Sequence, residues 1–149
     1  MLRMHKVLGR QEAEEMFGRG SVPMLAIDAM TKVRITVMNL KTEPINVKGH
    51  WSVKAKKTKI IRETVYLHVL GSKARRRGLP VSVRITRLSA GELDFLAVGE
   101  ALKACVDGLA DGLGLPDDKK LQMPERMTLA QETCKRGTFG IRIDLVFEL

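Results

Sequence analysis

The sequence predicts a single α+β domain in which two main helices pack against one mixed β-sheet. The chain has 149 residues, of which 44% are hydrophobic, enough to form one domain with a sizeable core. Segments in which apolar and polar residues alternate are interspersed with segments in which apolar residues recur every three or four positions. These are the periods of half-buried strands and amphipathic helices. Their order, β-α-β-α-β-β, favours one mixed sheet that carries two helices.

Each element follows from its local pattern. Residues 1–30 are weakly patterned apart from a helical patch around Gln11–Phe17, so the folded domain is expected over residues 31–149. Val33, Ile35 and Val37 alternate and predict the first strand over 33–39. The remaining prediction is a loop at 40–49, a helix at about 51–70, a basic loop at 71–78, a strand at 79–88, a helix at 94–113, a short strand at 127–132 and a last strand at 139–147.

The first helix has a less regular apolar pattern than the second. Its inward-facing candidates are Ile60, Ile61, Val65 and Leu67. Trp51, at its start, is expected to lie in the core or to anchor the helix, because tryptophan buries a large apolar ring. His50 suits a helix cap, a packed position or a phosphate contact, and His68 suits a partly buried structural position.

The helix expected over residues 94–113 has the clearest apolar face and has acidic residues at both ends. That face comprises Val98, Leu102, Cys105, Leu109 and Leu113, and the opposite face Glu100, Lys103, Asp107 and Asp111. Asp94 precedes the helix, while Asp117 and Asp118 follow its glycine- and proline-rich end. If neighbouring strands brought these ends together, the carboxylates would suit a hard cation such as Mg²⁺. An ordinary surface helix with solvated charges has the same spacing.

Most of the chain's positive charge falls in one segment. Between His50 and Gly78 there are nine cations and only one acid, Glu63, so the segment accounts for +8 of the net charge of +9. Such a localised positive field indicates a polyanionic partner, although a lysine-rich helix also serves solubility. The nine cations of this segment are Lys54, Lys56, Lys57, Lys59, Arg62, Lys73, Arg75, Arg76 and Arg77. The part of the segment from Gly71 to Gly78 is a loop flanked by glycines and is expected to bury few side chains.

The two cysteines and the hydropathy favour a cytoplasmic protein without a membrane partner. Cys105 and Cys134 have no metal-ligand spacing, and Cys105 falls on the apolar helix face as a small core residue. No apolar run approaches the length of a membrane span. Neither a disulfide framework nor an oxidising compartment is therefore expected.

Several stretches together resemble a known family over roughly residues 33–147. They read INVKGHWSVKAKKTKIIRETVYLHV, VSVRITRLSAGELD, ALKACVDGLADGLGLPDD and AQE…GTFGIRIDL. The combination resembles the RusA family of Holliday-junction resolvases, especially its phage-encoded members. The resemblance implies a homodimeric, Mg²⁺-dependent endonuclease of recombination and repair that binds branched DNA and nicks opposed strands near the crossover; Mn²⁺ is a possible substitute.

The resemblance also implies site residues. In the family, a D-x-D-N motif opens the second helix, a lysine lies nearby and an aspartate pair follows the helix. These correspond here to Asp94, to Lys103, and to Asp117 and Asp118. On this basis Asp94 and Asp118 would hold the metal, Asp117 or Glu92 would assist, and Lys103 would neutralise charge on the scissile phosphate. The nine cations of the basic segment, with His50, would hold the DNA arms.

One departure from the family pattern affects the expected activity. Leu96 and Ala97 stand where the motif has its second acid and its asparagine, and leucine cannot ligate a metal. Either Glu92 or Glu100 substitutes for the missing carboxylate, or the protein binds branched DNA without efficient catalysis. A basic RNA-binding α/β domain is a third possibility, with little support because only 4% of residues are aromatic.

Overall fold

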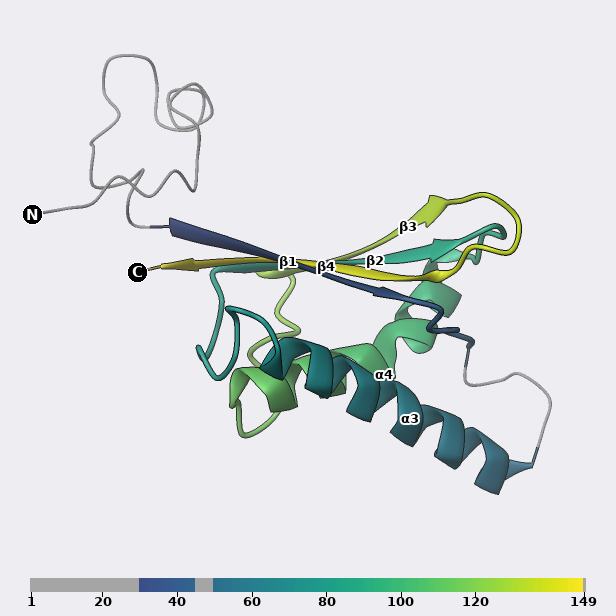
Figure 1. Cartoon of the computed structure of the whole chain (residues 1–149), viewed down its shortest axis with the longest axis horizontal. Coiled ribbons are helices and arrows are strands. Elements are labelled where there is room, and N and C mark those ends of the chain that lie inside the picture. The colour runs from purple at the N-terminus through teal and green to yellow at the C-terminus, as the bar shows by residue number, and fades with distance from the viewer. Residues whose placement is uncertain (1–29, 45–49, 149) are drawn as a thin grey trace, which may run out of the picture.

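The structure, a computed structural model, describes residues 30–44 and 50–148, which form a four-stranded mixed sheet and two helices (Figure 1). The elements are β1 (Met30–Met38), α3 (Trp51–Leu70), β2 (Ser82–Ser89), α4 (Phe95–Leu113), β3 (Met127–Thr133) and β4 (Gly140–Glu148). The predicted α+β class and element order are therefore confirmed. The helical patch expected around Gln11–Phe17 lies outside the described residues.

The sheet has the strand order β1-β4-β2-β3. Strand β4 runs antiparallel to both β1 and β2, whereas β2 and β3 are parallel. A parallel pair needs a crossover connection, and α4 supplies it. The central row of the helix-covered face consists of apolar residues from all four strands: Ile35, Ile143, Ile85 and Leu129.

Both helices cover one face of this sheet (Figure 1). On the other face, Arg34 pairs with Asp144 at 2.6 Å and Arg142 pairs with Glu132 at 2.7 Å. Within the described part of the chain no helix lies over these charges, so this face is polar where the opposite one is apolar. None of the helices in residues 30–44 and 50–148 combines the length and apolarity needed to cross a membrane.

Helix α4 forms the centre of the core. All five residues of its predicted apolar face are buried. Two glycines on a neighbouring face allow α3 to approach closely. A Cβ atom on Gly108 would lie 2.3 Å from the Arg62 carbonyl oxygen, and one on Gly112 would lie 2.5 Å from the Val69 Cβ. Any larger side chain at these positions would therefore force the two helices apart.

Helix α3 corrects several expectations. Val65 and Val69 are fully buried and Ile61 packs against the core, but Ile60 and Leu67 are 60% and 63% exposed. Trp51 is 75% exposed, so its expected core position is wrong. Only the C-terminal half of α3 packs closely against α4, and its N-terminal half extends away from the sheet (Figure 1). Trp51 lies in the half that extends away, whereas Leu67 lies in the last turn on a side of α3 that is exposed.

Candidate nucleic-acid interface and carboxylate cluster

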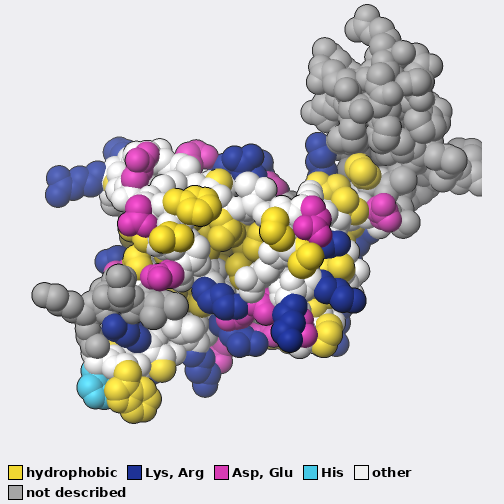
Figure 2. All heavy atoms as spheres, turned by 180° about the vertical axis from the view of Figure 1, so that it is seen from behind, with side chains coloured by type: hydrophobic (Ala, Val, Ile, Leu, Met, Phe, Trp, Pro, Cys, Tyr) yellow, Lys and Arg dark blue, Asp and Glu magenta, His cyan; other side chains and the backbone are white. Residues whose placement is uncertain are grey.

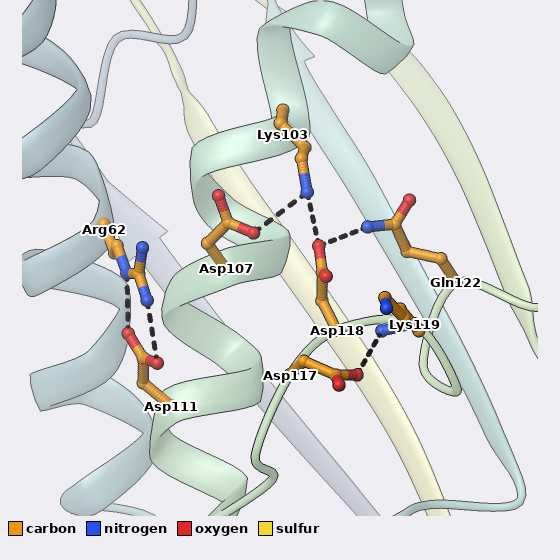
Figure 3. A network of polar contacts seen from close by, with 8 residues as sticks. All are labelled: Arg62, Lys103, Asp107, Asp111, Asp117, Asp118, Lys119 and Gln122. Atoms are coloured by element: carbon orange, nitrogen blue, oxygen red, sulfur yellow. Dashed lines mark hydrogen bonds and ion pairs between the residues drawn. The ribbon is translucent and has the colours of Figure 1, made fainter.

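Lys103 joins two carboxylates that come from different parts of the chain (Figure 3). Its ammonium donates to Asp107 Oδ1 at 3.0 Å and also to Asp118 Oδ2. Lys103 and Asp107 are four residues apart on α4 and therefore face the same way. Gln122 also donates to Asp118. We call Lys103, Asp107 and Asp118 the carboxylate cluster.

Asp118 reaches this cluster because α4 ends abruptly. Gly114 adopts a left-handed conformation with φ of 78°, and its N–H bonds to the carbonyls of the last helical turn. Glycine tolerates this conformation because it lacks a Cβ. The chain then turns back along α4, so that Asp118 lies beside a residue 15 positions earlier.

Electrostatics in the cluster favour the ionised forms of Asp118 and Lys103. The hydrogen bond from Lys103 lowers the pKa of Asp118 to about 2, although partial burial opposes this shift. Partial burial alone would lower the pKa of Lys103, but the hydrogen bonds to Asp118 and Asp107 raise it overall. Asp118 and Lys103 thus both stay charged at neutral pH.

A second ion pair adjoins the cluster. Arg62 Nε and Nη2 donate to the two Asp111 oxygens at 2.7 and 3.0 Å, which joins α3 to α4 (Figure 3). The bonds from Arg62 to Asp111 raise the pKa of Arg62, and the charges of Asp107 and Asp118 add to this effect. Arg62, predicted as a DNA contact, is therefore engaged in a bidentate interhelical pair.

Asp94 takes a structural role at the start of α4. Its Oδ1 accepts a hydrogen bond from the Ala97 N–H at 2.9 Å, which is an N-cap. The nine residues from Asp94 to Lys103 span about 13 Å along the helix axis. Asp118 bonds to Lys103, so in this structure Asp94 and Asp118 have different partners, and the expected sharing of one cation by the two stays a prediction.

The other predicted acids are also directed elsewhere. Glu92 accepts a hydrogen bond from the Thr133 hydroxyl at 3.5 Å, near the start of α4. Asp117 accepts one from the Lys119 N–H at 2.9 Å (Figure 3). Leu96 is 76% exposed. In the part of the chain that the structure describes, no group of three or more His, Cys, Asp or Glu side chains is placed to hold a metal ion.

Asp107 belongs to the carboxylate cluster, although the sequence pattern assigns it only to the polar face of its helix. Its spacing from Lys103 indicates an exposed intrahelical pair, and that pair is present. What the spacing does not reveal is the third partner, Asp118, because its position depends on the turn after α4. Two carboxylates from different parts of the chain thus converge on the ammonium of Lys103.

Five cations at the two ends of α3 have no acidic partner among the described residues: Lys54 and Lys56 in its first half, and Lys73, Arg75 and Arg76 just after its last turn. We call these five the α3 cations. The same is true of Arg77, which lies against Phe147, and of cations outside α3 such as Arg84, Lys120 and Lys135. Figure 2 shows that some of the basic side chains on this face lie against acidic ones. Lys57 pairs with Glu43 at 3.6 Å, and Lys59 pairs with Glu63 at 3.8 Å.

The loop after α3 is held more firmly than its glycines suggest. The N–H groups of Arg76 and Gly78 each donate at 2.9 Å to carbonyls near the end of α4. Ala74 is fully buried, and the Arg77 guanidinium lies 4.8 Å from the Phe147 ring centroid. Ala74 is the only buried residue of 71–78, so the expectation that this loop buries few side chains is confirmed, although Arg77 packs on an aromatic ring.

A cavity of about 370 Å³ lies between the N-terminal half of α3, α4 and the segment that follows β1. Its apolar lining includes Val53, Ile61 and Ala101, with Lys54 and Lys103 also contributing. Above it, at the start of α3, His50 caps the helix, because its Nδ1 accepts from the Ser52 N–H at 3.2 Å. His50 therefore caps the helix, which is one of the roles expected for it.

The sequence matches no protein-family model, and a comparison with curated proteins gives no match.

Proposed function

We propose that the protein binds branched DNA and that the α3 cations contact its phosphates. The observation that carries this proposal is their lack of acidic partners among the described residues, while neighbouring cations are paired. Helix α3 also has no acid in its first turn. Its 20 residues span about 30 Å, so contacts at its two ends would follow several successive phosphates. Each such contact releases condensed counterions, which favours binding.

The choice of branched DNA rests on the resemblance to the RusA family. A homodimer, which that resemblance implies, would present two copies of α3 related by two-fold symmetry. A four-way junction has matching symmetry, so that each subunit would contact an equivalent pair of arms. The cytoplasm, the compartment proposed from the sequence, is where such DNA is available.

Competition between DNA structures tests this proposal. Purified protein is bound to a labelled four-way junction and challenged with unlabelled junction or with blunt duplex of the same length and sequence. We expect the junction to compete at least tenfold better than the duplex. Equal competition would reduce the proposal to general DNA binding, and no binding to either DNA would overturn it.

The carboxylate cluster supports a second candidate function, Mg²⁺-dependent nicking of the bound DNA. Asp107 and Asp118 would hold the metal, which in such sites activates water and stabilises charge on the phosphate. Lys103 would then neutralise charge that develops on the scissile phosphate. Its ammonium lies between the two carboxylates, so a metal that bound there would displace it toward the adjoining phosphate. The junction is incubated with protein and Mg²⁺ or Mn²⁺ and its strands are examined for nicks. Intact strands would overturn the nicking function and leave DNA binding as the only proposed function.

A further inference from the structure

Trp51 stands in an unusual place for a tryptophan. It is the only tryptophan in the chain, it is the first residue of α3, and it is 75% exposed. Tryptophan is highly buried on average because its ring is large and apolar. Its recorded ring neighbour is His50, with the two centroids 5.6 Å apart and the planes inclined by 33°. One face of the indole is thereby supported, and most of the ring remains open to solvent.

The charge around this ring is positive. From Trp51 to Arg62 the helix carries five cations and no acid. Lys54 lies one turn after Trp51 and lines the cavity of about 370 Å³ beside it, together with the apolar Val53. An open aromatic ring next to unpaired lysines matches the two parts of a nucleotide, because the base offers a π-face and the phosphate a negative charge.

We propose that Trp51 stacks on an unpaired base of the bound DNA while Lys54 and Lys56 contact the adjoining phosphates. This inference rests on the proposed function and adds to it the feature that distinguishes branched DNA from duplex. Bases in a continuous duplex are stacked on one another and cannot receive an indole ring, whereas bases at a branch or in a single strand can.

A second exposed aromatic residue provides a matched control. Phe95 is 88% exposed at the start of α4, but it follows Asp94 and lies close in sequence to Glu92. The acids around it would repel a phosphate, so exposure alone does not make an aromatic residue suitable for stacking on DNA. Replacement of Phe95 removes an exposed ring of comparable size without touching the positive surface of α3.

Tryptophan fluorescence tests the proposal directly, because emission from the full chain reports position 51 alone. The protein is titrated with a forked duplex that has single-stranded arms and with a blunt duplex of equal length. We expect the forked DNA to quench the emission at the concentrations at which it binds, and the blunt duplex to bind more weakly without quenching. Binding of forked DNA with unchanged emission would overturn the proposal.

Variants provide a second readout. Trp51→Ala should bind forked DNA about tenfold more weakly and blunt duplex as before, whereas Trp51→Phe should retain most of the affinity. Phe95→Ala should bind both as the unmodified chain does. If Trp51→Ala binds forked DNA as tightly as the unmodified chain, the stacking role is overturned, while the proposed phosphate contacts of the α3 cations are unaffected. An emission spectrum that shifts with protein concentration in the absence of DNA would mean that a second copy covers the ring, and would also overturn it. Failure of the unmodified chain to bind any DNA would overturn the proposed function as well.

Discussion

Helices α3 and α4 have almost the same length, 20 and 19 residues, yet they differ in nearly every other respect. Eleven residues of α4 are buried, including Leu102, Leu109 and Leu113, whereas only Val65 and Val69 of α3 are buried. On the polar face of α4, Asp107 and Asp111 are each paired with a cation. The N-terminal half of α3 instead exposes an aromatic ring and lysines without acidic partners among the described residues. The contrast indicates that α4 contributes most of the helical part of the core, whereas α3 leaves most of its surface exposed, which is why we propose it as the binding surface.

The largest expected effect is on stability, where the two helices touch. Gly108→Ala would place a Cβ 2.3 Å from the Arg62 carbonyl oxygen, a backbone atom that cannot move without shifting α3. We expect it to lower the free energy of unfolding by about 3 kcal/mol, measured by urea denaturation.

Gly99 is the matched control on the same helix, because a Cβ there would meet no heavy atom within 4 Å. Gly99→Ala should leave stability unchanged or raise it by up to about 1 kcal/mol, since alanine favours helix more than glycine does. Similar losses in both variants would show that the close contact between α3 and α4 is not what Gly108 provides.

Nicking activity, the second candidate function, should depend on Asp107 and Asp118 and not on Asp94. Asp118→Asn or Asp107→Asn should reduce Mg²⁺-dependent nicking of a junction at least about 100-fold, because each removes a carboxylate charge from the cluster. Asp94→Asn keeps a good helix cap and should leave nicking unchanged. If Asp94→Asn abolished nicking while Asp118→Asn did not, the chemistry would lie at the start of α4 instead.

Removal of two α3 cations should weaken DNA binding without affecting the fold. In the double variant Lys54→Ala and Lys56→Ala, we expect the slope of log affinity against log salt to become shallower by about two units. The free energy of unfolding should change by no more than about 0.5 kcal/mol. Lys59→Ala, which removes a lysine paired with Glu63, serves as the control and should alter the slope less.

The smallest effect concerns pH. The pKa of Asp118 is lowered to about 2 by Lys103, so its contribution to stability is fully present above about pH 4 and is lost as pH falls toward 2. The pair is partly exposed, with 20% of the Asp118 side chain and 47% of the Lys103 side chain accessible. Solvent screening therefore limits the contribution to roughly 1 kcal/mol.

Thermal melts between pH 2 and 5 measure this contribution. Asp118→Asn and Lys103→Gln should each show a smaller loss of melting temperature on acidification than the unmodified chain. An identical acid sensitivity in all three proteins would show that the Lys103–Asp118 contact does not stabilise the fold.

Sequence patterns predicted the order of the elements and the apolar face of α4 because burial on one side leaves a period in the sequence. The same reasoning failed for Ile60, Leu67 and Trp51, since apolar character at helical spacing does not reveal whether another element covers that side. It also could not distinguish Asp94 as a cap from Asp94 as a ligand, because both roles place an acid just before a helix. The convergence of Asp107 and Asp118 depends on the turn at Gly114, which no local period encodes.

The salt dependence of junction binding tests most directly the claim that α3 carries the binding surface. Affinity of the unmodified chain for a four-way junction is measured from about 50 to 300 mM salt. If all five α3 cations contact phosphate, log affinity should fall with log salt at a slope of about −4 to −5. A slope near zero, or no measurable affinity at the lowest salt concentration, would contradict the account.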